Sequence, residues 1–331
     1  MQIEIRKKLA PFSHLPGTSA LIPRTPWEVQ VFPALLRFHH LGTGQREEIP
    51  LAHTGPIEGF TVQQDLERGF IRFFGRAKEG YFCSYLKANE QGIELDGKKL
   101  PFVSLEPDPL PPQKERLSFG VHKAQNWDFI KARLDPCEIW PFWLLLAQQT
   151  PKAALHKVGS FSLLASCERA SKVEIVYLWR QVLLGCIQGI LSPRLFDEQY
   201  QGLFPNHEAD KGISPLGLLH EGARQIRALF FLEQEGEISL LPHFPPECHA
   251  GRFIFVQTAR GDQLSFEWSK KRIKKVVFSP AYTGERFFKL QKGISSFRIR
   301  SSLKDKGRQA SSEKPFFCSG GSSLFLDRFS E

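Results

Sequence analysis

The sequence predicts a mixed α+β fold made of several domains, with a helical region between two β regions. Its 331 residues are enough for two or three domains. Short alternating apolar runs bounded by Gly and Pro occupy both ends, whereas in the middle apolar residues recur every three or four positions. A hydrophobic content of 41% with 29 Phe indicates a folded chain rather than a disordered one.

Residues 1–105 are predicted to form a β-sandwich-like domain. The expected strands are residues 3–9, 27–36, 59–64, 69–76 and 80–88. Asp96 and Gly97 suit a tight turn between Leu95 and Leu100. Four prolines among charged residues follow between positions 106 and 115, and proline supplies no backbone donor. Residues 106–121 are therefore predicted to be an extended linker.

Residues 122–235 are predicted to be helical. Residues 126–134 suit a short helix, and residues 137–150 are apolar on nearly every side, as in a helix enclosed by others. A third helix is expected to end just before Pro193. Its apolar stripe is Ile175, Trp179, Val182, Cys186 and Ile190.

A fourth helix is expected to begin after Ser214, a plausible N-cap, with Pro215 in its first position. Its apolar stripe is Leu216, Leu219, Ala223, Ile226 and Phe230. Residues 236–300 are predicted to form a second β-sandwich-like domain, in which residues 264–268 alternate as on a half-buried strand. Residues 301–331 are either a flexible tail or a segment that docks residues 325–329 on the body, and the sequence does not decide between these.

Six cysteines are scattered without CxxC pairs, which excludes a zinc ribbon and a short-loop disulfide framework. We expect most of them to be reduced, and we expect no metal and no cofactor. The longest strongly apolar run has nine residues, whereas a transmembrane helix needs about 20. Because no conventional secretory signal follows the basic start, we expect a cytoplasmic location, although a specialised export route leaves no readable mark.

His220 and Glu221 lie on a predicted helix that could bind zinc or supply a catalytic acid or base. A zincin helix needs a second His four residues after the first, but Arg224 occupies that position, and a cation opposes metal binding. Zinc binding is therefore rejected. His220 remains a candidate acid or base, against the simpler interpretation of a partly buried, hydrogen-bonded histidine beside a Glu221–Arg224 pair.

The segment before this helix is rich in acidic residues and reads as irregular. His207, Glu208 and Asp210 are candidate catalytic residues there, because paired carboxylates at a suitable separation can act as general acid and base on a glycosidic bond. The alternative is a solvated acidic loop. Both interpretations stay open, since composition does not place side chains in space.

The positive charge is concentrated in residues 269–308. Thirteen Lys and Arg stand there against Glu285 and Asp305, a balance of +11, so that the rest of the chain carries about −2 of the total +9. Such a segment could bind nucleic acid or another acidic surface. A solvated basic hairpin is the favoured interpretation, because no recognition fold or stacking platform accompanies the charge.

The last third of the sequence resembles the end of the (α/α)6-barrel glycosidases of the inverting fucosidase and maltose phosphorylase type. In that family the last barrel helix leads into Leu-Leu-Pro and Leu-Pro segments, and then into a β-sandwich with an Arg-Gly turn and a Glu-Trp strand end. The matching residues here are Leu240, Leu241, Pro242, Phe244, Pro245, Gly251, Arg260, Gly261, Glu267 and Trp268, with residues 273–279 as the returning strand. The likeness covers about 70 residues and is structural in kind.

Two departures limit what the resemblance implies. Cys248 stands where the family has a Trp, and residues 122–233 number only 112, whereas twelve helices with loops need well over about 200. At most half a six-hairpin barrel fits, so no catalytic residue is carried over. The resemblance implies an ancestry in carbohydrate-active proteins and a shared order of β, helical and β regions, not an activity. The hypothesis that we favour is a reduced, non-catalytic glycosidase-like protein that binds a carbohydrate or scaffolds a related enzyme as a protein partner.

Three hypotheses follow for function. The first is the non-catalytic carbohydrate binder, with Trp127, Trp143 and Trp268 as candidate platforms for sugar rings. The second is a residual glycoside hydrolase that uses the acidic loop. The third is a binder of nucleic acid or an acidic surface through the basic segment.

Overall fold

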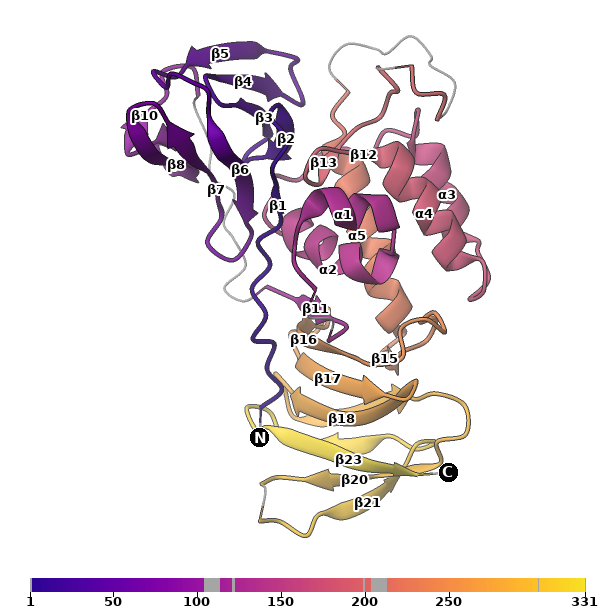
Figure 1. The fold of residues 1–331 in the computed structure, drawn as a ribbon. Coiled ribbons are helices and arrows are strands. Elements are labelled where there is room, and N and C mark those ends of the chain that lie inside the picture. Colours follow the sequence, from indigo (N-terminus) through magenta and orange to yellow (C-terminus); the bar gives the residue numbers. More distant parts are fainter. Residues whose placement is uncertain are drawn as a thin grey trace.

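A computed structural model describes residues 2–103, 114–120, 123–198, 200–203, 213–302 and 304–330. Within these residues mostly antiparallel sheets combine with five helices, which confirms the mixed α+β class. The N-terminal strands lie beside the helices, and the C-terminal strands lie beneath both (Figure 1).

The N-terminal β region contains two sheets. The six-stranded sheet has the order β1 (Phe12–Ser13), β6 (Glu58–Asp65), β7 (Phe70–Ala77), β8 (Gly80–Asn89), β9 (Gly92–Leu95), β10 (Lys98–Lys99). The four-stranded sheet has the order β2 (Thr18–Leu21), β3 (Trp27–Phe32), β4 (Leu35–His40), β5 (Arg46–Pro50). The side chain of Gln64 on β6 donates to the carbonyl of Leu21 on β2 at 2.7 Å, which ties the two sheets together. At the predicted turn, Asp96 and Gly97 have φ of 50° and 81°, as a tight hairpin requires.

The prediction of a strand at residues 3–9 is wrong. Residues 2–11 form no strand, and they run upward from the C-terminal sheets to the N-terminal ones (Figure 1). Along this path Arg252 donates to the carbonyl of Glu4 at 3.1 Å, and the Ala10 N–H donates to Gln125 at 2.7 Å. The alternating pattern therefore reflects an extended segment held by side chains of other elements.

The central region holds all five helices of the described residues. They are α1 (Trp127–Arg133), α2 (Pro136–Ala147), α3 (Phe161–Glu168), α4 (Ile175–Cys186) and α5 (Leu216–Phe230). Helix α2 is buried on nearly every side, as predicted. Trp179 of α4 meets the rings of Trp140 and Trp143 edge to face, with centroids 5.6 and 5.4 Å away. Gly222 of α5 allows close approach, since a Cβ there would lie 2.6 Å from the Trp143 ring.

Helix ends agree with the sequence patterns in part. Asn126 caps α1 through its side chain, and the Ser214 hydroxyl accepts from the Leu216 N–H at 3.3 Å, although α5 begins one residue after the predicted Pro215. Helix α4 ends at Cys186 rather than just before Pro193. The chain turns there into the short hairpin β12 (Ile187–Gln188) and β13 (Ser192–Pro193). Ile190 is still buried, but in the hairpin turn.

The C-terminal β region also contains two sheets. The seven-stranded sheet has the order β11 (Arg116–Ser118), β16 (Gly251–Gln257), β17 (Gln263–Ser269), β18 (Arg272–Ser279), β23 (Leu324–Ser330), β20 (Ser296–Arg300), β21 (Arg308–Ser311). The four-stranded sheet has the order β14 (Phe231–Gln234), β15 (Glu237–Leu240), β19 (Gly284–Lys289), β22 (Phe316–Cys318). Phe288 and Phe316 of the smaller sheet meet Phe278 and Phe297 of the larger one at centroid distances of 5.2 to 6.3 Å.

Two segments predicted to lie outside the domains are strands of this region. Residues 116–118 belonged to the expected linker, but they form β11, the edge strand beside β16. Of the two alternatives for the tail, the structure has the docked one, because β23 pairs with both β18 and β20. Leu326 of this strand is buried between its neighbours.

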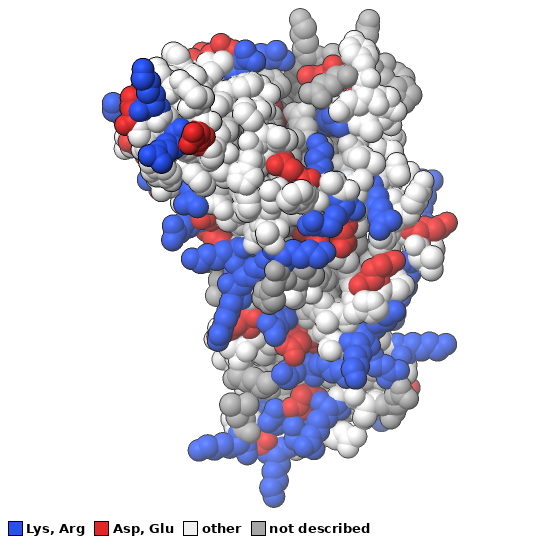
Figure 2. All heavy atoms as spheres, in the orientation of Figure 1, with Lys and Arg blue, Asp and Glu red and all other residues white. Residues whose placement is uncertain are grey.

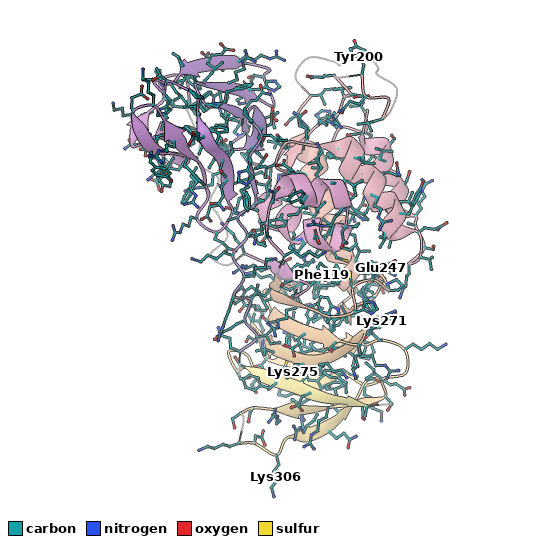
Figure 3. The ribbon with its side chains drawn as sticks, in the orientation of Figure 1. Phe119, Tyr200, Glu247, Lys271, Lys275 and Lys306 are labelled. Carbon is teal, nitrogen blue, oxygen red and sulfur yellow. The ribbon has the colours of Figure 1, made fainter. Side chains whose placement is uncertain are left out.

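An aromatic cluster joins the helices to the seven-stranded sheet. Phe119 follows β11 and lies at this junction in Figure 3. Its ring contacts Phe230 of α5, Trp140 of α2 and Trp268 of β17 at centroid distances of 5.5, 6.3 and 6.0 Å. The rings of Phe230 and Trp268 stack at 5.4 Å. Burial of such large rings makes the junction a continuous core.

Candidate functional site

His220 of α5 is hydrogen-bonded to residues that follow α2. Its Nε2 lies 2.8 Å from the carbonyl oxygen of Pro151 and 3.3 Å from the Thr150 hydroxyl. Arg224 forms hydrogen bonds of 2.6 and 2.8 Å to Glu221 and also binds Glu168 at 2.9 Å. The simpler interpretation of this helix, a partly buried histidine beside a Glu–Arg pair, is therefore confirmed.

The acidic loop before α5 is only partly described. His207, Glu208 and Asp210 lie outside the described residues. Asp197, at the start of the same segment, accepts from the backbone N–H groups of Gln201 and Leu203 at 3.0 and 3.2 Å. This buried carboxylate therefore holds the described part of the segment, up to Leu203.

The three tryptophans predicted as sugar platforms are core residues, which corrects that prediction. Trp127, Trp143 and Trp268 are exposed by only 2%, 0% and 1%. The indole N–H groups of Trp143 and Trp268 donate to the carbonyls of Leu219 and Cys248 at 2.8 and 2.9 Å. No ring face of these three residues is free to meet a ligand, because each fills space between packed elements.

The basic segment lies on the C-terminal sheets, where Lys and Arg outnumber acidic residues on the face shown (Figure 2). Part of its charge is balanced within the fold. Arg298 and Arg300 pair with Asp327, Arg286 pairs with Asp262, and Lys275 pairs with Glu267. Lys306 points away from the body at the lower end (Figure 3).

A polar hollow of about 540 Å³ lies between the four-stranded N-terminal sheet and the central region. This volume is in the range of ligand sites in proteins. Strands β3, β4 and β5 line one wall, and the β12–β13 hairpin and the following residues line the other. Phe196 contributes a half-buried aromatic ring to the second wall.

The wall formed by the sheet is an ordered array of side chains, here called the polar face. Glu28, His39 and Arg46 are successive cross-strand partners on β3, β4 and β5, and so are Gln30, Arg37 and Glu48. All six line the hollow. Alternation along a strand places residues two apart on one side of the sheet, so Leu36 and Phe38 are buried on the opposite side.

Glu28 is the most buried residue of the polar face. It is only 6% exposed, and its Oε1 accepts from the Ser192 hydroxyl at 2.5 Å and from the Gln188 amide at 3.0 Å. His39 Nδ1 lies 3.7 Å from the other carboxylate oxygen. Burial alone would raise the pKa of Glu28, but the contacts with His39, Ser192 and Gln188 outweigh burial and hold this pKa below its ordinary value. Glu28 is therefore an ionised acceptor.

The hairpin that supplies Ser192 and Gln188 is fixed against β2. The Ile190 N–H donates to the carbonyl of Ser19 at 2.7 Å. Gly189 has a φ of 47°, and a Cβ on it would lie 2.1 Å from the same Ser19 oxygen, so only glycine fits. Arg194 bonds the carbonyls of Leu184 and Gly185 at the end of α4, which holds the hairpin from its other side.

Two further groups of the hollow have defined partners. Arg37 donates to Glu48 at 2.7 Å, with both side chains more than half exposed. His40 Nδ1 accepts from the N–H groups of Gly42 and Thr43 at 3.0 Å each. Burial is the main cause that lowers the pKa of His40, which keeps this imidazole neutral.

Sequence patterns did not point to the polar face. Glu28 interrupts the apolar residues of β3. A buried charged residue often marks a functional site, but only the structure shows that Glu28 is buried. The pairing with His39 depends on strand register, and Ser192 lies 164 residues away in the chain. No local pattern brings these three together.

A scan of the chain against protein-family models finds no match, and a search of curated proteins finds none either. In the part of the chain that the structure describes, no three or more His, Cys, Asp and Glu side chains gather closely enough to hold a metal ion. Every helix among the described residues is too short or too polar to span a bilayer.

Proposed function

We propose that this protein binds a neutral carbohydrate in the hollow above the polar face and does not hydrolyse it. The observation that carries the proposal is the array of six planar or ionic side chains in two cross-strand rows. Guanidinium, carboxylate, amide and imidazole groups offer donors and acceptors in fixed directions, as sugar hydroxyls need. Phe196 adds an apolar surface for the C–H face of a ring.

The charge of the polar face favours an uncharged ligand. Arg37 and Arg46 are matched by Glu28 and Glu48, so the array carries no net charge when His39 is neutral. A phosphate or nucleic acid site needs an excess of Arg and Lys. A neutral polyol is the ligand class that satisfies paired donors and acceptors without leaving a buried charge.

We expect binding without turnover because Glu28 is ionised and already hydrogen-bonded. A general acid on a glycosidic bond needs a raised pKa and a free proton, whereas the pKa of Glu28 is lowered and its oxygens already accept hydrogen bonds. Glu48 is held by Arg37. These carboxylates are suited to accept hydrogen bonds from sugar hydroxyls.

The resemblance of the last third to (α/α)6-barrel glycosidases supports the same ligand class. We extend the proposal to the architecture: two β-sandwiches that flank a partial α/α barrel, reduced from a carbohydrate-active ancestor. The order of β, helical and β regions is compatible with this descent. A glycan binder of this kind could also position a related enzyme on its substrate.

The test is a glycan array with the intact chain, run beside a hydrolysis assay on α-linked sugars. We expect binding of a neutral oligosaccharide and no turnover. Arg37→Ala should raise the Kd about tenfold or more, about 1.4 kcal/mol, because a guanidinium donor to the ligand is lost. Arg252→Ala is the matched control, since Arg252 also forms an exposed ion pair, with Glu267, but lies outside the hollow. Its Kd should stay unchanged.

Other outcomes overturn the proposal. Turnover that Glu208→Gln or Asp210→Asn abolishes would replace it with the hydrolase hypothesis. A complex with nucleic acid that weakens steeply with salt, without any glycan binding, would replace it with the basic segment as the functional surface. Equal loss of binding in Arg37→Ala and Arg252→Ala would place the ligand elsewhere.

A further inference from the structure

Two cysteines from different regions meet at the junction between the helices and the seven-stranded sheet. Cys137 lies in the first turn of α2, where its N–H donates to the N-cap Asp135 at 3.0 Å. Cys248 lies in the turn between β15 and β16, next to Glu247, which Figure 3 places at this boundary. The Cys248 N–H donates to Pro245 at 3.1 Å, and its carbonyl accepts from the Trp268 indole at 2.9 Å.

The two thiols are in direct contact. The Sγ atoms of Cys137 and Cys248 lie 2.9 Å apart, across 111 residues of sequence. A disulfide bond is about 2.05 Å long, so the sulfurs need to approach by about 0.9 Å. Rotation of the two side chains about their Cα–Cβ bonds is the movement that would close this gap, while hydrogen bonds of both backbone N–H groups hold the local chain.

We propose that Cys137 and Cys248 are a modification site, oxidised by a hydroperoxide to an intramolecular disulfide that joins α2 to the C-terminal β region. This inference does not depend on carbohydrate binding, since neither cysteine lines the hollow above the polar face. The disulfide would add a covalent link at the boundary where Phe119 packs against Phe230, Trp140 and Trp268, and where Arg227 of α5 already donates to the carbonyl of Gln257 on β16.

The environments of the two thiols define their roles. Cys137 is partly exposed, so a peroxide reaches it, whereas Cys248 is 2% exposed. The shared hydrogen bond with Cys137, together with burial, raises the pKa of Cys248. Cys137 is thus the attacking residue and Cys248 the resolving one.

The chemistry balances in two steps. The Cys137 thiolate attacks one oxygen of the peroxide, the O–O bond breaks, and the protein is left with a sulfenic acid while hydroxide takes a proton to become water. The Cys248 sulfur then attacks the sulfenic sulfur, the S–S bond forms, and the departing hydroxide accepts the Cys248 proton. Two thiols and one hydrogen peroxide give one disulfide and two waters.

Two other cysteines provide an internal contrast. Burial raises the pKa of both Cys167 and Cys186 to about 12. Their Sγ atoms donate to the backbone carbonyls of Leu163 and Ser160 at 3.7 and 3.5 Å. A buried thiol that stays protonated reacts slowly with peroxide, so Cys167→Ser is a matched control.

The experiment treats the whole chain with hydrogen peroxide, blocks free thiols, and maps peptides without reduction. We expect one cross-linked peptide pair containing Cys137 and Cys248, and a Tm about 4 °C higher that dithiothreitol reverses. Cys167→Ser should keep both effects, and Cys137→Ser and Cys248→Ser should lose both.

Thiol counting on the wild-type chain keeps the test valid if a variant fails to fold. Oxidation should remove two of the six thiols that react after denaturation. Six thiols that persist, a Cys137 sulfinic acid without a cross-link, or a cross-link that survives in Cys248→Ser would each overturn the proposal.

Discussion

Two buried carboxylates, one in each β region, are both ionised but are stabilised in different ways. Asp262, 1% exposed in the turn just before β17, receives two hydrogen bonds from the Arg286 guanidinium at 2.6 and 3.1 Å and one from the Ala281 N–H at 2.8 Å. Glu28, 6% exposed on β3, accepts from a hydroxyl and an amide and lies beside a partly exposed imidazole.

The difference separates a closed ion pair from a carboxylate that lines the hollow, where we propose that the ligand binds. Asp262 and Arg286 neutralise each other in a closed, bidentate arrangement that leaves nothing for a partner to recognise. Glu28 has neutral partners on one side and the hollow on the other. A buried charge without a full countercharge costs stability, and such costs concentrate at functional sites.

The largest expected effect is on Asp262. Asp262→Asn leaves the Arg286 charge buried without a counterion, so the free energy of unfolding should fall by about 3–5 kcal/mol. Urea denaturation measures this change. Glu48→Gln, which breaks the exposed Arg37 pair, is the control and should cost less than about 1 kcal/mol. A similar loss in the two variants would contradict the distinction between closed and exposed pairs.

A smaller effect is expected at Glu28. In Glu28→Gln the amide oxygen still accepts from Ser192 and Gln188, so the free energy of unfolding should fall by only about 1–2 kcal/mol. Glycan affinity should fall as well, which Asp262→Asn should not cause at a temperature where that variant is folded. A Glu28→Gln protein with unchanged affinity would remove this carboxylate from the binding surface.

Acid should destabilise the protein through both carboxylates. Their pKa values are lower in the folded than in the unfolded state, so the unfolded chain takes up protons first and stability falls as pH drops below about 4. Denaturation midpoints between pH 5 and 3 should show this slope. Each of Asp262→Asn and Glu28→Gln should flatten it, and unchanged slopes would contradict the assigned ionisation.

The smallest effect concerns His40. Because burial lowers its pKa, the unfolded chain binds the proton first, and a small part of the stability should be lost as pH falls through about 6.5. His40→Asn keeps an acceptor for the Gly42 and Thr43 N–H groups but does not titrate. The midpoint difference between pH 7.5 and 5.5 should therefore be smaller in this variant than in the wild type.

The sequence predicts correctly those elements that depend on residues close together in the chain, and it fails where an element depends on residues far away in the chain. The α5 stripe and the Asp96–Gly97 turn follow from local spacing, and both are confirmed. The strand at residues 3–9, the continuation of α4 and the undecided tail depend on distant partners: Gln125, the Ser19 carbonyl, and strands β18 and β20.

The candidate site was harder to predict for the same reason. The three tryptophans predicted as sugar platforms have large apolar rings, and they are buried in the core because burial of apolar surface stabilises the folded state. The polar face needs the register of three strands and a hairpin from more than a hundred residues away. Composition showed the charged residues of this face but not their alignment.

We propose above that a neutral sugar contacts the polar face, and this contact can be observed at the histidines. The most direct measurement is a titration of the array-selected oligosaccharide into the protein while the imidazole resonances of His39 and His40 are followed by NMR. We expect saturable shifts for His39, with His220 of α5 unchanged. Shifts confined to His220, or none at any histidine while the glycan is bound, would contradict this expectation.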